Sequence, residues 1–244
     1  MSATLKRFYK DVSLASHDEG GYAVLLDGRT AKTPGRNVLR AEARILAEAL
    51  AEEWRAQGEE IRLDDLPLTR MQGFALDGAE KGRGEWSETI KSFAGSDLLC
   101  YRASDPKLAK RQAEMWQPPL DQIGGRCGLV FQITEGVMAV DQPAELEGAI
   151  DDLLNGFSSG AVFATKLLTE AYGSAVLALA VAYEEISAAE AFAASRLDET
   201  FQNEVWGVDA EAAARDAAIQ REAETIVRFL FLSEGKAYSA AETD

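Results

Sequence analysis

The sequence predicts an α+β fold, with a small β-rich mixed domain over residues 1–84 and a larger, mainly α-helical domain over residues 85–244. Most short β-prone runs lie near the beginning of the chain, whereas amphipathic or alanine-rich segments fill the remainder. Charge changes at the same place, because residues 1–84 carry 13 basic and 14 acidic side chains and the rest carries 12 and 27. The glycine-rich stretch 81–84 is the expected linker.

The first domain is expected to combine hairpins with a helix. Short strands are expected at residues 8–14, 22–26, 29–33 and 61–68. Asp27-Gly28 predicts a tight hairpin turn, because this dipeptide readily supplies the two positive φ angles of a type I′ turn. Apolar residues recur every three or four positions over residues 41–57, which predicts an amphipathic helix that ends at Gly58.

Helices dominate the second domain. They are expected at residues 85–93, 106–123, 144–154, 162–172, 174–185, 188–205 and 210–232. The pair Pro118-Pro119 is expected to interrupt the second of these, because proline lacks the N–H that a helix uses. A short strand is expected at residues 97–101, and a hairpin at 129–134 and 137–140. The helices at the end of the chain predict a bundle, which buries their apolar faces together.

Composition excludes several classes of partner. With 25 basic and 41 acidic residues the net charge is −16, which disfavours binding to nucleic acid or to anionic membranes. The longest apolar run, residues 175–182, is far shorter than the ~20 residues that span a bilayer, so we expect no membrane insertion. The start of the chain lacks a signal peptide, and the two cysteines exclude a disulfide framework. We therefore expect a cytoplasmic protein whose mature chain begins here.

Catalytic signatures are missing from the sequence. It contains no phosphate-binding glycine loop, and neither Cys100 nor Cys127 has a plausible histidine partner. His17 lies in a polar turn and is expected to be solvated rather than to act as a base. No spacing of carboxylates demands an acid/base pair, so an enzyme that uses two carboxylates is the weaker alternative. We expect no enzyme, no cofactor and no metal site.

The predicted helix over residues 188–205 has two unusual faces. A capping box, Ser187 with Glu190, begins it, and Gly207 marks its end. At 100° per residue one face is the expected core stripe, formed by Ala194, Leu197, Phe201 and Val205. The opposite face gathers Phe192, Arg196, Glu199, Asn203 and Trp206, so that two aromatic residues bracket a charged pair.

Two interpretations of that second face remain open. It can be a further buried contact in which Arg196 and Glu199 neutralise each other, or a surface that binds a partner protein, where aromatic residues and arginine supply much of the affinity. Residues 141–227 carry 17 acidic and 4 basic side chains, which would attract a basic partner surface. A charged exterior that merely keeps the protein soluble also explains this excess.

Several short blocks, in order along most of the chain, resemble one chaperone family. They are Arg7-Phe8-Tyr9-Lys10, Leu26-Asp27-Gly28-Arg29 with Lys32-Thr33-Pro34, Glu53-Trp54 with Gln57, Pro67-Leu68-Thr69, Asp97-Leu98-Leu99-Cys100-Tyr101-Arg102-Ala103, and Leu197-Asp198-Glu199 with Phe201-Gln202 and Trp206-Gly207. In these blocks the chain is similar to the chaperones that bind the alpha subunit during assembly of the F(1) head of ATP synthase. It departs from their pattern at Gln117, where an acidic residue is expected, and at Leu66, where methionine is usual.

The resemblance implies a non-enzymatic assembly factor that binds the free alpha subunit and prevents its aggregation until the beta subunit replaces it. Relatives occur in mitochondria and alphaproteobacteria, and the missing transit peptide suits a bacterial member. The resemblance also implies a functional acidic residue, which we assign to Glu199. The partner-binding candidates are then Phe192, Arg196, Asp198, Glu199, Gln202, Asn203 and Trp206. We expect a monomer, and the alternative is an acidic helical adaptor unrelated to ATP synthase.

Overall fold

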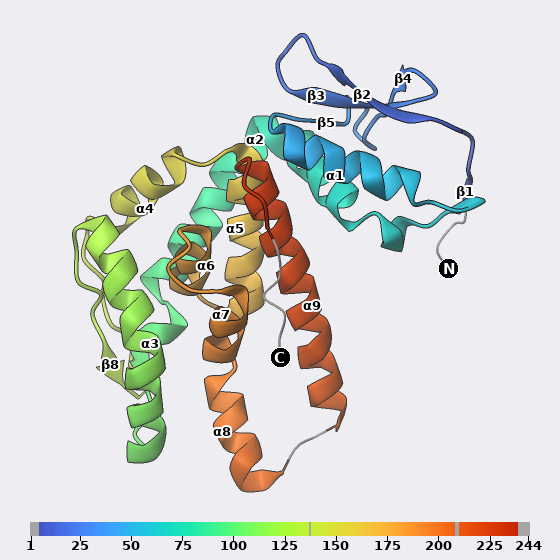
Figure 1. Cartoon of the computed structure of the whole chain (residues 1–244). Helices are drawn as coiled ribbons and strands as arrows, with labels where there is room; N and C mark the ends of the chain where they lie inside the picture. Colours follow the sequence, from blue (N-terminus) through green and yellow to red (C-terminus); the bar gives the residue numbers. More distant parts are fainter. Residues whose placement is uncertain (1–4, 137, 208–209, 239–244) are drawn as a thin grey trace. The chain divides into compact units, whose positions relative to one another are not determined.

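The structure is a computed structural model that describes residues 5–136, 138–207 and 210–238; the side chains of residues 79–81, 210 and 212 are not described. The chain forms two compact units (Figure 1). Unit 1 comprises Met1–Arg83, Ser158–Ala161 and Arg228–Asp244, and unit 2 comprises Gly84–Phe157 and Val162–Val227. Strands gather near the start of the chain and helices follow, so the predicted α+β class is confirmed.

A small antiparallel sheet forms the β part of unit 1. Its strands are β2 (Val12–Ser16), β3 (Tyr22–Leu26), β4 (Arg29–Thr30) and β5 (Arg40–Ala41). All three other strands pair with β3, the most buried strand of the sheet. Asp27 and Gly28 join β3 to β4 with φ angles of 49° and 76°. The predicted hairpin turn is therefore present, and its two positive φ angles are those of a type I′ turn.

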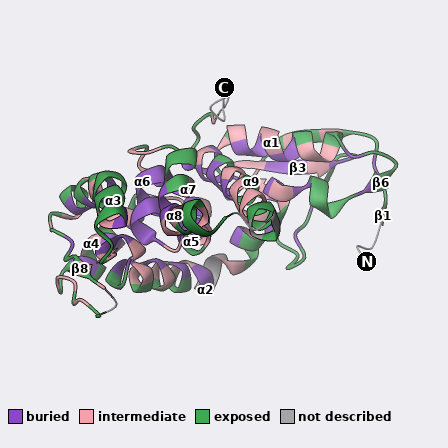
Figure 2. Ribbon diagram, turned by 90° about the horizontal axis from the view of Figure 1, so that it is seen from below, coloured by how far each residue is buried: buried purple, intermediate pink, exposed green. Residues whose placement is uncertain are grey.

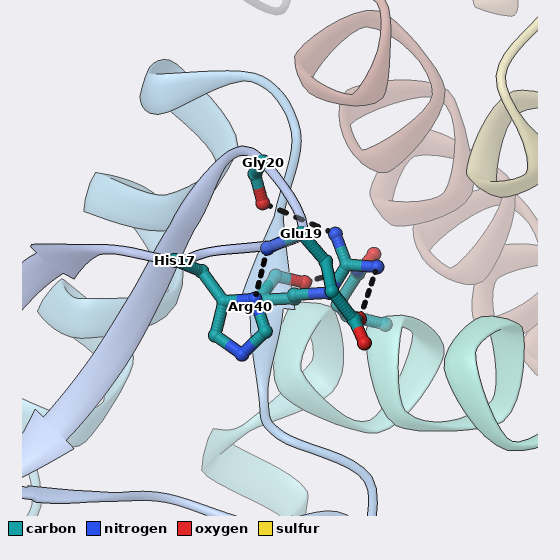
Figure 3. A network of polar contacts seen from close by, with 5 residues as sticks. His17, Glu19, Gly20 and Arg40 are labelled. Atoms are coloured by element: carbon teal, nitrogen blue, oxygen red, sulfur yellow. Dashed lines mark hydrogen bonds and ion pairs between the residues drawn. The ribbon is translucent and has the colours of Figure 1, made fainter.

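The turn between β2 and β3 is held by polar contacts to Arg40 (Figure 3). The Arg40 guanidinium donates to the carbonyl of Gly20 at 3.2 Å and to the carboxylate of Glu19 at 3.4 Å. The N–H of Glu19 donates to Nδ1 of His17 at 3.2 Å. Gly21 has φ 76°, and a Cβ there would lie 2.3 Å from a carbonyl oxygen of β5, so the position requires glycine.

Helix α1 (Arg44–Arg55) covers the sheet with one apolar face. Its buried residues are Leu46, Ala47, Leu50 and Ala51, which recur at the predicted helical spacing. After it, β6 (Glu60–Ile61) pairs with β1 (Leu5–Lys6). The strand expected over residues 61–68 is wrong beyond Ile61, because a 3₁₀ turn (Leu63–Asp65) follows and Pro67 takes the favoured first position of the next helix.

Helix α2 (Pro67–Gly95) runs through the boundary between the units. The linker expected at residues 81–84 is wrong, since these residues are helical. Glycine costs only about 1 kcal/mol relative to alanine inside a helix. The part of α2 that belongs to unit 2 buries Trp86, Ile90 and Ala94, and this burial outweighs the cost of the glycines.

Unit 2 is built mainly from helices. They are α3 (Pro106–Cys127), α4 (Leu146–Asn155), α5 (Ser159–Tyr172), α6 (Ala175–Ala182), α7 (Ala188–Ser195), α8 (Leu197–Trp206) and α9 (Ala210–Ser233), of which α5 begins and α9 ends in unit 1. All residues of α6 are buried (Figure 2). A helix that is apolar on every side belongs in a core, and α6 contacts both α3 and α7.

Helix α3 continues through Pro118 and Pro119. The predicted interruption is therefore wrong, although each proline removes a helical hydrogen bond. The same stretch buries Trp116, Leu120 and Ile123, and this packing keeps the segment helical.

The strands of unit 2 pair differently from the prediction. Residues 97–101 form a 3₁₀ turn (Leu98–Cys100) that leads into β7 (Tyr101–Arg102), and β7 pairs in parallel with β8 (Thr134–Glu135). The hairpin expected at 129–134 and 137–140 includes residue 137, which lies outside the described residues. Its described part is wrong, because Thr134 pairs with β7 and Gln132 instead exchanges hydrogen bonds with the side chain of Gln142.

Candidate functional site

The predicted helix over residues 188–205 is two helices. Helix α7 ends at Ser195 and α8 begins at Leu197, with Arg196 between them at φ −108° and ψ 12°. The N–H of Arg196 closes α7 by donating to the carbonyls of Phe192 and Ala193. Because the helix is interrupted at Arg196, a single helical wheel does not describe the two faces.

Both predicted ends of this region are confirmed. The hydroxyl oxygen of Ser187 accepts from the N–H of Glu190 at 3.2 Å, and the Glu190 carboxylate accepts from the N–H of Ser187 at 2.8 Å. The Ser187 hydroxyl also donates to the Glu190 carboxylate at 2.7 Å, and the hydrogen bonds that this carboxylate accepts from the N–H and the hydroxyl of Ser187 lower its pKa. Gly207, with φ 92°, follows the last residue of α8.

The predicted core stripe is only half correct. Ala194 and Leu197 are buried, whereas Phe201 is half-buried and Val205 is 60% exposed. The stripe therefore packs where α7 meets α8 and leaves the core toward the end of α8. The remainder of α8 is a largely exposed surface helix.

The side chain of Arg196 contacts four groups: two carboxylates, one backbone carbonyl and one aromatic ring. Its guanidinium lies 3.7 Å from the carboxylates of both Glu199 and Asp216, the latter on α9. It donates to the carbonyl of Ala171 at the end of α5 at 3.2 Å, where helix C-termini favour a cation. Its carbon centre lies 5.6 Å from the ring of Phe192. The predicted pair of Arg196 and Glu199 is thus present, with the arginine more enclosed than the glutamate.

Asp198 points into a different network. Its carboxylate accepts from the side-chain amide of Gln112 on α3 at 2.7 Å. Gln112 is buried, and its amide oxygen accepts from the N–H of Ala103 at 2.7 Å. Nearby, the indole N–H of Trp116 donates to the carbonyl of Ala194 at 2.9 Å. Asp198 therefore anchors the start of α8 to α3, and it is less available to a partner than Glu199.

A second contact ties the middle of α8 to α3. Arg111 donates to the Glu204 carboxylate at 2.7 Å and lies 5.4 Å from the ring of Phe201. This hydrogen bond lowers the pKa of Glu204 and raises that of Arg111. Both side chains are substantially exposed, so the pair contributes little to stability.

A cavity of about 290 Å³ lies beside the junction of α7 and α8. Its lining includes Trp116 of α3, Glu170 near the end of α5, and Arg196, Asp198 and Glu199. Three carboxylates and one guanidinium therefore surround it, which makes it an acidic recess.

The remaining candidates lie further along α8. Gln202 and Trp206 are exposed, Trp206 by 85%, and Asn203 is half-buried. Trp206 follows Glu199 by two helical turns, a rise of about 10 Å. The structure therefore groups Phe192, Arg196 and Glu199, turns Asp198 toward α3, and places Gln202, Asn203 and Trp206 along the more exposed part of α8.

Comparison with known proteins identifies the family. The family model described as ATP12 chaperone protein matches residues 6–124. The crystal structure of Atp12 from Paracoccus denitrificans is 35% identical to this chain, with a TM-score of 0.88 over 93% of this chain and 98% of that one. The chain belongs to the ATP12 chaperone family.

Two further structures match this ATP12-family chain. An aspartate-to-lysine mutant of the P. denitrificans protein is 35% identical with a TM-score of 0.89, over 93% of this chain and 97% of that one. A candidate chaperone from Agrobacterium tumefaciens is 40% identical with a TM-score of 0.86, over 93% of this chain and 85% of that one. The similarity thus extends far beyond the segment that the family model matches.

The histidine and the two cysteines of this ATP12-family chain lie in local structural settings. Nδ1 of His17 accepts a hydrogen bond within its turn. Burial raises the pKa of Cys100 to about 12 and that of Cys127 to about 11, so both thiols stay protonated near neutral pH. In the described part of the chain no group of His, Cys, Asp and Glu is placed to hold a metal ion. Likewise, no helix of the described residues is long and apolar enough to cross a bilayer.

Several residues of this site were missed by the sequence analysis. They are Arg111, Gln112, Trp116, Ala171 and Asp216, which contact the region of α7 and α8 from α3, α5 and α9. Most lie at least 78 residues from their partners along the chain, and periodicity carries no signal over such a separation. The ATP12-family chain therefore supports its candidate surface with contacts that only the fold brings together.

Proposed function

We propose that this chain is a chaperone for assembly of the F(1) sector of ATP synthase. It binds the free alpha subunit in the bacterial cytoplasm, acts as a monomer without catalysis, and keeps the subunit from aggregating until beta replaces it. The observation that carries the proposal is membership of the ATP12 chaperone family, with similarity over 93% of the chain.

The physical need for such a protein follows from the client. A subunit that is not yet assembled exposes the apolar surface that will later contact its neighbour, and such surfaces aggregate. A chaperone that covers this surface shifts the equilibrium toward the unaggregated subunit by mass action. Its affinity must be lower than that of the final partner, so that assembly releases it.

We assign this binding to the surface of α8 that carries Glu199, Gln202, Asn203 and Trp206, which we call the Glu199 surface. Glu199 is 54% exposed and Trp206 is 85% exposed. Exposed tryptophan is a strong interface anchor, and a carboxylate nearby selects a basic complement on the partner. Arg196 positions Glu199, while Asp198 fixes the start of α8 against α3.

The alternative is an adaptor that joins two proteins permanently. Its surface would also be acidic and aromatic, so the two functions differ in what happens after assembly. A chaperone leaves when beta arrives, whereas an adaptor stays in the final complex.

Size-exclusion chromatography with isolated alpha subunit tests the proposal. We expect the chain to co-elute with alpha and to elute alone once beta is added. Absence of co-elution contradicts the proposed function, and a stable complex with both subunits supports the adaptor instead.

Variants of α8 locate the surface. We expect Glu199→Lys to weaken alpha binding at least tenfold while the melting temperature changes little, because the side chain is exposed. Glu222→Lys on α9 is the matched control, since it makes the same charge change at another exposed helical position. Equal binding by both variants would contradict the assignment of Glu199.

A further inference from the structure

Unit 1 carries two neighbouring cavities that share part of their lining. One, of about 540 Å³, lies beside the hairpin of β3 and β4; the other, of about 530 Å³, lies beside the start of α2. Lys32 and Trp54 line both. We call the two together the Trp54 cavities, and their principal lining residues are Phe8, Arg29, Lys32, Trp54, Arg70 and Phe74.

Large apolar side chains are exposed around these cavities. Phe8 is 65% exposed, Phe74 is 63% exposed, and Leu63, which lines the second cavity, is 55% exposed. Single exposed apolar residues are ordinary, but here three of them line two cavities that share Lys32 and Trp54. Covering them removes apolar surface from water, which favours association.

A hydrogen-bond donor in the shared lining is unused. The indole nitrogen of Trp54 is buried and has no hydrogen-bond partner in the described part of the chain. The ring is fixed from one side, since it packs edge-on against Tyr9, whose hydroxyl donates to the Trp54 carbonyl at 2.7 Å. A buried N–H without an acceptor is costly, so this donor is an unsatisfied group within a residue of the shared lining.

The two carboxylates that line the cavities are already engaged. Asp27 accepts from the N–H groups of Lys10 and Asp11 at 2.9 and 2.8 Å. Asp77 accepts from the hydroxyl of Thr33, from the N–H of Gly35 at 2.8 Å and from the side chain of Asn37 at 2.9 Å. Both carboxylates therefore accept hydrogen bonds that stabilise loops of unit 1.

The cations of the lining, in contrast, are free. Arg29, Lys32 and Arg70 are exposed, and within residues 5–136, 138–207 and 210–238 no hydrogen bond or ion pair engages their side chains. Three unpaired cations beside apolar surface favour a ligand that is both apolar and acidic. The lining as a whole carries three cations and two carboxylates, so its charge favours an acidic segment over a basic one.

We infer that the Trp54 cavities bind an extended protein segment in which bulky apolar side chains lie next to carboxylates. The inference rests on the proposed function, because an unassembled subunit is a source of such segments. It adds a second client-binding surface, with a preference opposite to that of α8: the cavities select acidic and apolar segments, whereas the Glu199 surface selects basic ones.

Fluorescence anisotropy with a labelled peptide tests the preference. The probe is a ten-residue peptide in which leucine and phenylalanine alternate with glutamate, added to the full chain. One comparison peptide has lysine at every glutamate, and another has serine at every apolar position. We expect both to bind at least tenfold more weakly than the probe. Failure of the probe to bind, or equal binding of the lysine peptide, would overturn the inference.

Variants then place the binding in the cavities. We expect Lys32→Glu with Arg70→Glu to weaken probe binding at least tenfold. The matched control is Lys107→Glu with Lys110→Glu, which makes the same charge change on exposed residues of α3. Phe74→Ser is a second test that leaves the charge alone, and its exposed position makes misfolding a minor concern. Probe binding that is unchanged in both cavity variants would overturn the inference.

Capture of alpha subunit, run in parallel, separates the two proposals. If the wild-type chain binds the probe but not alpha, the proposed function fails and the peptide preference stands. If it captures alpha but the probe does not bind, or binds without regard to the cavity residues, only the second surface fails.

Discussion

Glu53 in unit 1 and Asp97 in unit 2 both accept hydrogen bonds from N–H groups at the start of a helix, and the two carboxylates differ in burial. In unit 1 the Glu53 carboxylate accepts from Leu68 at 2.7 Å and from Thr69 at 2.8 Å, at the start of α2. In unit 2 the Asp97 carboxylate accepts from Val176 at 3.0 Å, at the start of α6. Asp97 also accepts from the N–H of Leu99 and the hydroxyl of Ser174.

Burial sets the protonation of these two groups. Asp97 is fully buried, and this burial raises its pKa to about 6 although four hydrogen bonds oppose the shift. Glu53 is half-buried, and burial raises its pKa against the opposing hydrogen bonds and the charge of Arg228. A helix that is buried on all sides, such as α6, needs its acceptor inside the core, where burial disfavours the charged form of a carboxyl group.

Both carboxylates belong to blocks on which the family resemblance depends. Glu53-Trp54 and Pro67-Leu68-Thr69 are separate in sequence, yet the hydrogen bonds of Glu53 join them. Asp97 begins another block and binds α6, more than 70 residues away. These blocks therefore include residues that hold each unit together, whereas the Glu199 block lies on an exposed helix.

Removing the buried carboxylate should have the largest effect. We expect Asp97→Ala to lower the free energy of unfolding by about 4 kcal/mol, because it leaves several buried donors without an acceptor. Urea unfolding measures this. A loss below about 1 kcal/mol would mean that the core of unit 2 does not need this acceptor.

The pH dependence of stability should be the next largest effect. Since the folded-state pKa of Asp97 lies near 6, above its usual value near 4, the folded state binds this proton more tightly between those pH values. The contribution of Asp97 to the free energy of unfolding therefore falls as pH rises from 4 to 6, by about 3 kcal/mol in total. The measurement is the free energy of unfolding of wild type and of Asp97→Asn at each pH. An equal slope of this free energy against pH in both proteins would refute the pKa shift.

The half-buried carboxylate should matter less. We expect Glu53→Ala to lower the free energy of unfolding by about 2 kcal/mol, because it removes the acceptor for two N–H groups of α2 that water can partly reach. Glu53→Gln should lower the free energy of unfolding by less, since its amide oxygen still accepts a hydrogen bond from one of the two N–H groups. If Glu53→Ala cost as much as Asp97→Ala, burial would not be the cause of the difference.

Removing the exposed capping carboxylate of α7 should have the smallest effect on the free energy of unfolding. We expect Glu190→Ala to cost about 0.5 kcal/mol, because water replaces its hydrogen bond to the N–H of Ser187. Thermal unfolding compares it with wild type at pH 7. A cost near that of Glu53→Ala would show that burial is a poor guide for these caps.

Local signals predicted part of the fold. Asp27-Gly28 and Ser187 with Glu190 form the predicted turn and capping box, because their hydrogen bonds and φ angles involve neighbouring residues. The helix through residues 81–84 and the break at Arg196 were not predicted, since tertiary burial decides the first and contacts to α5 and α9 accompany the second.

The candidate site shows the same division. The helical period of the sequence predicted that Glu199 and Trp206 share one face, but a buried contact and an exposed surface both fitted that pattern. Their exposure, 54% for Glu199 and 85% for Trp206, is known only from the structure. The hydrogen bond of Asp198 to Gln112 could not be predicted, because it spans 86 residues. The Trp54 cavities were also missed, since Lys32, Trp54 and Arg70 share no periodic pattern along the chain.

The composition of unit 1 from distant segments has a consequence for its biosynthesis. Its strands are made first, but Ser158–Ala161 and Arg228–Asp244 also belong to it. During translation the strands of unit 1 are therefore made well before the far segments that complete this unit, and most of unit 2 is made in between. Chains generally fold as their domains emerge. Here the part synthesised first is among the last to be completed, so a nascent chain that stalls before residue 228 displays an unfinished unit 1.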